Sequence, residues 1–294
     1  MELFFSQLVN GLTIGSTYAL VALGIVLIFS VLDVMSVAQG EILIASAYAG
    51  FVWFHNHVSS NLVLCALVVV AVSIVIGMLT ERIAVRPALH GGHLATLITT
   101  VGVGLILSNG VQILAGPDAQ LVKNDAAVLP LFHVAGVAVT VIAAASVLVL
   151  AAGFAGLKYF TEKTRAGSWV RAVAEDSETA AAMGVDVRRL RAATFAVGCM
   201  LAGIAAVLLS LKYGNLTPHL GVGFSLTALT AAIIGGANRV EGAVLVAFVL
   251  GIAETMTTSY LGADYILLVQ FSFFLAILLV LPEGIFRRTT RRAG

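Results

Sequence analysis

Charged residues are scarce in this chain, and so are the residues that build small soluble scaffolds. Only 11% of the 294 residues are Asp, Glu, Lys or Arg, against roughly 25% in soluble domains. The two cysteines, Cys65 and Cys199, lie inside apolar runs, which excludes a disulfide framework and a thiolate metal site. A net charge of +1 offers no basic surface to nucleic acid. These deficits exclude the soluble classes of protein.

Apolar residues dominate the composition. They make up 60% of the chain, with a mean hydropathy of +1.05. Because a spanning helix needs about 20 apolar residues, we expect an all-α polytopic membrane protein with about 8–10 transmembrane helices in a single domain, residues 1–294. We place nine spans near 8–31, 36–54, 62–80, 94–115, 135–157, 190–212, 223–238, 241–261 and 264–283. The seventh is short and bounded by glycines, so we expect it to be broken or partly re-entrant.

Basic residues predict the orientation, because Lys and Arg stay mostly on the cytoplasmic side. Nine spans with the N-terminus outside leave only Lys123 and Lys212 outside. The other fourteen fall on one face: Arg82, Arg86, Lys158, Lys163, Arg165, Arg171, Arg188, Arg189, Arg191, Arg239, Arg287, Arg288, Arg291 and Arg292. The sequence therefore predicts a cytoplasmic C-terminus. Gly11 and Gly15 predict close helix packing within the first span.

Residues 158–191 form the longest polar interruption, with twelve of the 31 charged residues. The tally above places this segment in the cytoplasm. Ser168 is a plausible N-cap for a short helix through Ala174, and Trp169 and Val173 would share the face that anchors it to the bundle.

A second short helix follows in the same segment. Asp176 or Ser177 can cap its start, and Gly184 can end it in a left-handed conformation. Its exposed face would be Ala180, Ala181, Ala182 and Met183. Bare methyl groups outside the membrane suit a groove on another protein. The alternative is an ordinary loop that orders itself on its own bundle.

Polar residues inside the spans are costly and therefore candidates for a solute path. The candidates are Gln39, Glu41, Asn109, Gln112, Glu254 and Thr257. Glu254 either accepts a structural hydrogen bond from a neighbouring helix or lines the pore. Glu41 either lines the path or helps Gln39 and Gly40 to cap the second helix at the cytoplasmic rim. The histidines have no cysteine or carboxylate close by in the sequence, so we expect no metal site.

Three blocks of the sequence resemble one transporter family. Residues 11–50, GLTIGSTYALVALGIVLIFSVLDVMSVAQGEILIASAYAG, and the C-terminal blocks IIGGANRVEGAVLVAFVLGIAET and LVLPEGIF are similar to the H-type permease of branched-chain amino acid ABC importers. The series Arg171, Ala172, Ala174, Asp176, Ala180, Ala181, Gly184 and Val185 resembles the coupling loop of that superfamily. Gln39 stands where family members usually have His, which leaves the solute open.

The resemblance implies a partnership. Such permeases form half of the translocation path, contact two cytoplasmic ATPase subunits through the coupling loop, pair with a second permease, here an M-type one, and receive solute from a periplasmic binding protein. The loop residues Trp169, Arg171, Ala172, Asp176, Ala180, Ala181 and Gly184 would make the ATPase contact. The chain has no G-x-x-x-x-G-K-[ST] motif, so ATP would be used by the partners, and we expect no cofactor on this chain.

Other readings of the sequence stay open. The resemblance implies a bacterial inner-membrane importer of branched-chain or other small apolar amino acids. Permeases for urea, short amides or other small polar solutes share the same blocks. An ion-coupled secondary transporter or channel could also have these helices. A membrane enzyme is disfavoured, because no nucleophile and base occur at one membrane depth.

Overall fold

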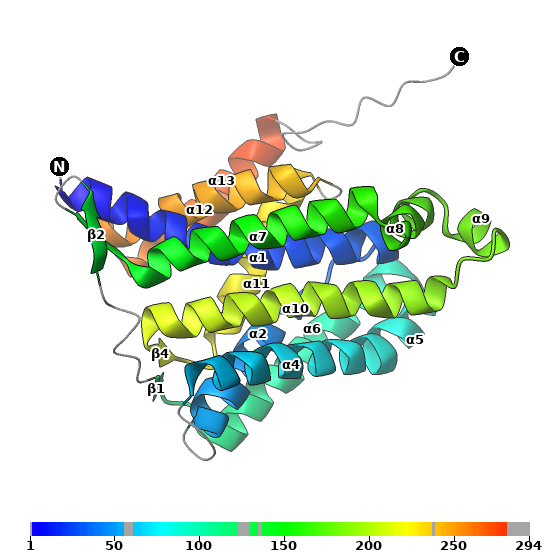
Figure 1. The fold of residues 1–294 in the computed structure, drawn as a ribbon, viewed down its shortest axis with the longest axis horizontal. Helices are drawn as coiled ribbons and strands as arrows, with labels where there is room; N and C mark the ends of the chain where they lie inside the picture. Colours follow the sequence, from blue (N-terminus) through cyan, green and yellow to red (C-terminus); the bar gives the residue numbers. More distant parts are fainter. Residues whose placement is uncertain (1, 56–60, 123–129, 135–136, 237–238, 281–294) are drawn as a thin grey trace.

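The computed structural model describes residues 2–55, 61–122, 130–134, 137–236 and 239–280 as a bundle of long helices (Figure 1). The long helices are α1 (Glu2–Leu32), α4 (Leu62–Thr80), α6 (Gly92–Ala115), α7 (Val141–Lys163), α10 (Val187–Tyr213) and α12 (Val240–Tyr260). Shorter ones are α2 (Gln39–Ala47) with its π-helical continuation η1 (Tyr48–Phe54), α11 (Leu220–Gly235) and α13 (Ile266–Val280). Within these residues, five segments are long and apolar enough to cross a bilayer, and the longest is continuous over Leu62–Ala115. The predicted helical membrane bundle is confirmed.

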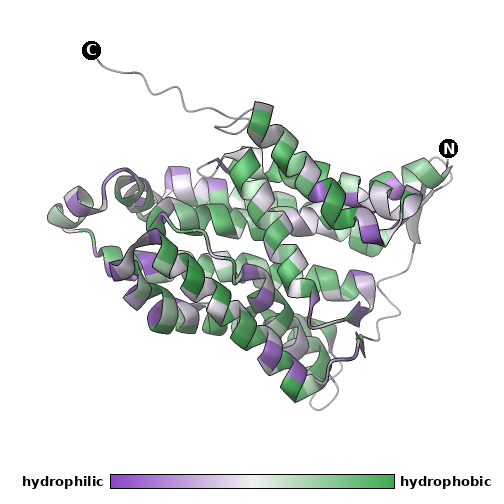
Figure 2. Ribbon diagram, turned by 180° about the vertical axis from the view of Figure 1, so that it is seen from behind, coloured by the Kyte–Doolittle hydropathy of each residue, from purple (hydrophilic) through white to green (hydrophobic). Residues whose placement is uncertain are grey.

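The bundle has two distinct ends. Helices α8 (Arg165–Glu175) and α9 (Ser177–Ala182) project from one end, called the polar end below, where the η2 (Glu81–Val85), α5 (Arg86–Ala88) and η3 (Leu89–Gly91) turns also lie (Figure 1). The N-terminus and the short strands occupy the opposite end. Hydrophilic residues are concentrated toward the two ends, and hydrophobic residues cover the helices between them (Figure 2). This distribution fits a bilayer around the middle of the bundle.

Helix α1 is the centre of the packing. It contacts α12, α10, α7 and α11, and its middle turns are fully buried. A methyl group placed on Gly11 would lie 2.7 Å from the Cα of Ile252, and one on Gly15 would lie 2.9 Å from the Cα of Phe248. Both glycines therefore face α12 at backbone contact, which confirms the predicted close packing.

The fifth predicted span begins too early in the sequence. Strands β2 (Pro130–Val134) and β3 (Val137–Thr140) form an antiparallel hairpin where the helix was expected to start at 135. Helix α7 starts only at Val141, where the hydroxyl of Thr140 accepts the N–H of Ala143, and it continues to Lys163. A β-branched run ending in a capping threonine favours a strand followed by a helix start. Strands β1 (Gln120–Leu121) and β4 (Asn215–Leu216) form a second small pair.

Helices α2 and α11 begin inside the bundle. The seventh predicted span is α11, which has only 16 residues, about 24 Å of helix, so its predicted shortness is confirmed. Helix α2 starts at Gln39 after a non-helical link of residues 33–38 that returns from the end of α1. A link of six residues can reach back roughly 20 Å. Both helices are half-helices whose first turns meet, as described below.

Candidate functional site

The polar segment folds as two short helices, but the first starts earlier than predicted. Helix α8 begins at Arg165, and its cap is Thr164, whose hydroxyl accepts the N–H of Gly167 at 3.0 Å. Ser168 is already inside the helix and donates its hydroxyl to the carbonyl of Arg165. The prediction of Ser168 as the cap was wrong because a threonine four residues earlier provides the same chemistry.

The anchoring face of α8 also differs from the predicted one. Val170 and Val173 are buried against the bundle, whereas the side chain of Trp169 is 50% exposed. Residues three or four positions apart both lie on one side of a helix. Here the pair three apart, Val170 and Val173, forms the contact face, and the predicted pair four apart, Trp169 and Val173, does not. Trp169 was predicted to anchor the helix, and it does not. Ala172 packs partly buried beside the same cluster.

Helix α9 is capped as predicted. The carboxylate of Asp176 accepts the N–H groups of Glu178 at 2.9 Å and Thr179 at 3.1 Å, and the hydroxyl of Thr179 at 2.5 Å. These bonds, the Thr179 hydroxyl foremost, lower the pKa of Asp176. The helix ends at Ala182, and Gly184 follows two residues later with a φ of +89°, a left-handed conformation that suits glycine.

The alanine face of α9 is smaller than predicted. Ala180 is only 1% exposed and packs into the core cluster with Val170 and Val173, so its assignment to the exposed face was wrong. Ala181, Ala182 and Met183 are exposed. Ala180 thus fixes α9 to the bundle from one side, and the other side presents small apolar groups to whatever lies beyond the polar end.

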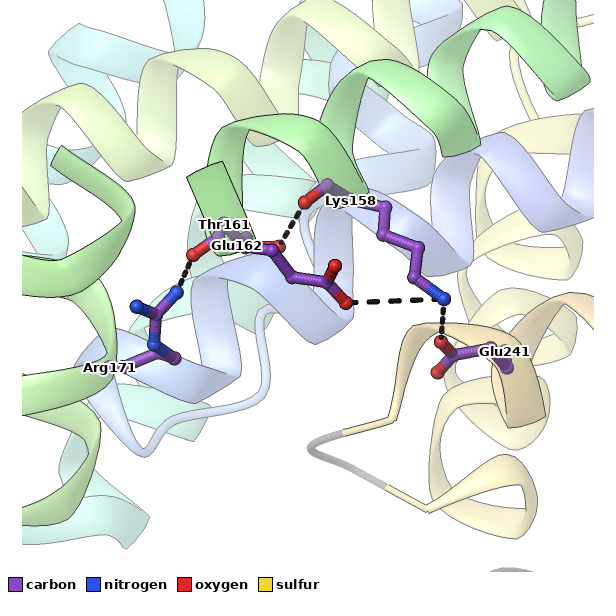
Figure 3. Close-up of polar contacts among 5 residues, drawn as sticks. All are labelled: Lys158, Thr161, Glu162, Arg171 and Glu241. Carbon is purple, nitrogen blue, oxygen red and sulfur yellow. Dashed lines mark hydrogen bonds and ion pairs between the residues drawn. The ribbon is translucent and has the colours of Figure 1, made fainter. Parts of the chain in front are cut away.

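Polar contacts tie this segment to two long helices (Figure 3). The guanidinium of Arg171 donates to the backbone carbonyl of Thr161, in the last turn of α7. Lys158 on α7 lies 3.0 Å from a carboxylate oxygen of Glu241, in the first turn of α12, and 4.0 Å from that of Glu162. A hollow of about 440 Å³ behind α8 is lined by parts of α1, α7, α8 and α12. The segment is therefore connected to α12 through the end of α7.

The first turn of α2 lies at mid-depth. A methyl group on Gly104 would lie 3.3 Å from the Cγ of Glu41, and Gly104 is twelve residues, about 18 Å, along α6 from its start at the polar end. The side-chain amide of Gln39 is 3.7 Å from the Sγ of Cys199, again about 18 Å along α10. These positions lie well inside the bundle, away from its polar end.

The interpretation of Gln39, Gly40 and Glu41 as a cap at the rim was therefore wrong. The sequence could not show that residues 33–38 re-enter the bundle before the helix starts. In addition, the cap residue of α2 is Ala38, which makes no side-chain capping bond.

Two helix starts meet at Glu41. The hydroxyl of Ser225, in the first turns of α11, accepts the N–H of Gly40 at 2.8 Å and donates to the carbonyl of Val37 at 2.5 Å. A methyl group on Gly221, the second residue of α11, would lie 2.6 Å from Oε2 of Glu41. Glycine at this position therefore allows the carboxylate to lie against the first turn of α11. We call Ser36, Gln39, Gly40, Glu41, Gly221 and Ser225 the central junction.

The central junction contains polar atoms without partners. Glu41 is 4% exposed, and neither of its carboxylate oxygens has a hydrogen-bond partner among the described residues. The same holds for Oε1 of Gln39 and the hydroxyl oxygen of Ser36. Burying a charge without pairing costs a great deal. The positive ends of two helix dipoles stabilise the carboxylate in part, and the arrangement still has unused capacity for a polar or charged group.

Glu254 is in a different environment. Its carboxylate accepts the hydroxyl of Tyr18 on α1 at 2.6 Å and the amide of Gln270 on α13 at 3.3 Å. Thr227 on α11 in turn donates to Gln270 at 3.2 Å. The structural hydrogen bond to a neighbouring helix, one of the two readings of Glu254, is therefore present. Helix α11 lies between this paired cluster and the central junction, since it supplies both Ser225 and Thr227.

The other candidates lie apart from these clusters. Asn109 is exposed on α6 and donates to the carbonyl of Leu105, Gln112 is partly buried one turn further along, and Thr257 is buried and donates to the carbonyl of Ala253. Sequence reasoning missed Ser225 and Tyr18. The glycine pair Gly221 and Gly223 was the available signal for Ser225, because it marks the start of the half-helix.

The fold and these sites define a multi-pass membrane permease. The family model for the permease component of branched-chain amino acid transport systems matches residues 7–281, and the chain belongs to that family. It is a transport permease and not an enzyme.

Individual relatives agree with this membership. The chain is similar to the high-affinity branched-chain amino acid transport system permease protein LivH of Escherichia coli, with 31% identity over 97% of this chain and 96% of that one. It is 32% identical to BraD of Pseudomonas aeruginosa, at the same coverage of both chains. It is also 31% identical to the xylose transport system permease protein XylH of Escherichia coli, but over only 35% of this chain and 28% of that protein.

Proposed function

We propose that this chain is one permease subunit of an ATP-driven importer for branched-chain amino acids in a bacterial inner membrane. Its partners are two cytoplasmic ATPase subunits, a second permease of M type and a periplasmic solute-binding protein. The polar end faces the cytoplasm and the N-terminus lies outside. The chain carries no cofactor, and the partners use the ATP. The names and coverage of LivH and BraD support the solute class.

One observation carries the assignment of the coupling loop. Helix α9 is fixed by a buried Ala180 and a capping Asp176, yet it presents Ala181, Ala182 and Met183 to solvent. An apolar face kept rigid outside the membrane costs solvation unless another protein covers it. We assign this face to a groove on an ATPase subunit. Trp169, exposed beside it, and Arg171, Ala172 and Gly184 belong to the same coupling unit.

The contacts inside the permease provide a route for movement. Arg171 connects α8 to the end of α7, so a displacement of α8 moves that end. The contact between Lys158 and Glu241 then passes the movement from α7 to the start of α12. The 440 Å³ hollow behind α8 leaves room for such a displacement. Helix α12 packs along α1 and α11, so its movement reaches the central junction.

The solute path, in this proposal, passes the central junction. Gln39 and Glu41 there have unused hydrogen-bonding capacity at mid-depth, the position typical of solute sites formed by discontinuous helices. Glu254 and Thr257 line the outer part of the path, and Asn109 and Gln112 face it from α6. The exposed amide of Asn109 would be costly against lipid, which supports a position facing the path or the second permease.

The substitution Ala181→Arg tests the coupling assignment. The side chain is exposed, so the permease is expected to fold and insert normally, while a bulky charge prevents the face from seating in the ATPase. Uptake of labelled leucine by the complete importer in proteoliposomes should be lost, with ATP hydrolysis no longer linked to uptake. Ala119→Arg, at an exposed alanine near the opposite end, is the matched control and should transport normally.

Three results would each contradict one part of the proposal. Unchanged leucine uptake by Ala181→Arg would remove the coupling role from α9. Uptake by the permease alone, driven by an ion gradient without any ATPase, would replace the importer with an ion-coupled transporter. Wild-type uptake of urea or an amide in preference to leucine would change the solute class and leave the coupling assignment intact.

A further inference from the structure

A basic hollow lies at the polar end, away from α9. It has a volume of about 350 Å³ and is lined by Arg86, Asp186, Arg188, Arg189 and Ala192. It therefore lies between the turns that follow α4 and the first turns of α10. None of its residues belongs to the coupling face or to the central junction.

Carboxylates orient two arginines of this hollow but accept only some of their N–H donors. Glu81 is buried and holds Arg86 through two contacts, from Nε at 3.2 Å and from Nη2 at 2.9 Å. Nε of Arg189 lies 2.9 Å from the carboxylate of Asp186, which leaves both of its terminal nitrogens in solvent. A guanidinium has five N–H donors in a rigid fork, so most donors of both arginines remain available.

A third arginine of the hollow, Arg188, adds unpaired donors. Arg188 is exposed and makes no hydrogen bond or ion pair with any residue that the structure describes. The hollow thus has more guanidinium donors than carboxylates to accept them, and a doubly charged or singly charged anion would complete it.

The surface next to the hollow is apolar. Ile83 is 70% exposed and Leu79 is also exposed, and they precede Arg86 by three and seven residues. Val75, Met78 and Leu79 share one exposed face of α4, and Ile83 lies in the π-helical turn that joins α4 to Arg86. An apolar strip thus runs along α4 toward the opposite end and ends at the basic hollow. This is the shape of an amphiphile that has an anionic head and hydrocarbon chains.

We infer that the hollow binds the phosphate headgroup of an anionic phospholipid, with its acyl chains along Leu79 and Ile83. Arginine forks match phosphate oxygens in a bidentate manner, and the cytoplasmic leaflet is the negatively charged one. The choice of leaflet rests on the proposed orientation. The binding itself requires only that this end of the bundle meets a membrane surface. Because Asp186 and Arg188 lead from the coupling loop into α10, the bound lipid fixes the base of that loop.

Native mass spectrometry of the complete importer tests this site. The double variant Arg188→Gln, Arg189→Gln is compared with Lys163→Gln, Arg239→Gln, which removes two exposed charges from the same end. Titration with phosphatidylglycerol should show a tight lipid adduct on the wild type and the control. Each arginine is expected to strengthen lipid binding about fivefold, so the Arg188→Gln, Arg189→Gln variant should bind phosphatidylglycerol roughly 25-fold more weakly than the wild type. Both altered arginines are exposed, so the fold is expected to survive.

The other outcomes of this experiment distinguish a lipid headgroup from free phosphate and from general charge attraction. Displacement of phosphatidylglycerol by millimolar inorganic phosphate would show a site for free phosphate and overturn the lipid assignment. Equally weakened lipid binding in both double variants would show general charge attraction and would also overturn the lipid assignment. The absence of any adduct because an ATPase subunit covers the hollow would overturn it as well. Lipid binding is measured without solute or transport, so these outcomes are independent of whether the chain carries amino acids.

Discussion

Two glutamates of this permease, one buried and one partly buried, have opposite environments. Glu254 accepts hydrogen bonds from Tyr18 and Gln270, and both bonds can be kept by a glutamine at that position. Glu41 has no partner among the described residues and lies against the first turn of α11. A neutral side chain at residue 41 removes the only negative charge among the residues of the central junction. We therefore expect the charge of residue 41 to matter more for transport than the charge of residue 254.

We expect Glu41→Gln to reduce leucine uptake by the complete importer by about 10- to 100-fold, since interactions with a charged group contribute roughly 1.5–3 kcal/mol and each 1.36 kcal/mol is tenfold in rate. Glu254→Gln should stay within about twofold of wild type, because the hydrogen bonds that hold it are preserved. Initial uptake rates in proteoliposomes, normalised to assembled complex, measure both. Full uptake by Glu41→Gln would remove this carboxylate from the solute path.

At the level of elements, α9 depends on the carboxylate of Asp176. The hydrogen bonds that lower its pKa act only in the folded helix, so the folded-state pKa lies below the unfolded value, near 3.8. Stability from this cap is therefore fully present above that unfolded value. It is lost as the pH falls through the folded-state pKa.

Hydrogen exchange over residues 178–184 checks this expectation. Wild-type protection, corrected for the intrinsic rate, should be constant near neutral pH and fall below pH about 4. Asp176→Asn keeps an acceptor for the helix N–H groups and should lose the pH dependence, whereas Asp176→Ala should exchange faster at every pH. An unchanged exchange rate in Asp176→Ala would show that packing of Ala180 alone holds α9.

The link between α7 and α12 is the ion pair of Lys158 and Glu241, whose side chains are both about half exposed. Such a pair contributes little to stability, so we expect its substitution to affect the proposed transmission of movement more than the fold. Lys158→Glu and Glu241→Lys should each lower ATP-linked uptake, and the double exchange should recover most of it, because the contact is re-formed with reversed charges. Glu162→Gln is the control, since Glu162 contacts Lys158 only at 4.0 Å within the same helix. Uptake that stays low in the double exchange would contradict a role for the contact itself.

The same elements show how far sequence alone could lead. Apolar length predicted the bundle, and capping chemistry predicted Asp176 and Gly184, because both depend on local sequence. Ala180 and Trp169 were misplaced because a one-residue change in helix phase exchanges the buried and exposed sides. The central junction could not be predicted, since it joins residues 36–41 to residues 221–225 through a re-entrant link that leaves no periodic signal. Residues 281–294, including the basic tail used for the orientation, lie outside the described structure.

For the whole molecule, the direction in which it crosses the membrane decides which partners can reach each end. Fourteen of the sixteen basic residues fall on one side of the predicted topology, and the polar end carries α8, α9 and the basic hollow. Positive residues are retained on the cytoplasmic side, which is also the side of the proposed ATPase subunits and of the anionic leaflet. The coupling proposal and the lipid leaflet therefore depend on the same orientation.

Site-directed labelling can determine that orientation in intact cells. The native Cys65 and Cys199 are buried, so the unsubstituted chain should stay unlabelled by a membrane-impermeant maleimide and serve as the control. Met183→Cys places an exposed thiol on α9, and Asp118→Cys places one beyond the end of α6. In spheroplasts, Asp118→Cys should react and Met183→Cys should not, and both should react after permeabilisation. Adding the ATPase subunits should then protect Met183→Cys alone, because its face would be covered. The reverse pattern in spheroplasts would place the polar end outside, and α9 could not then contact a cytoplasmic ATPase.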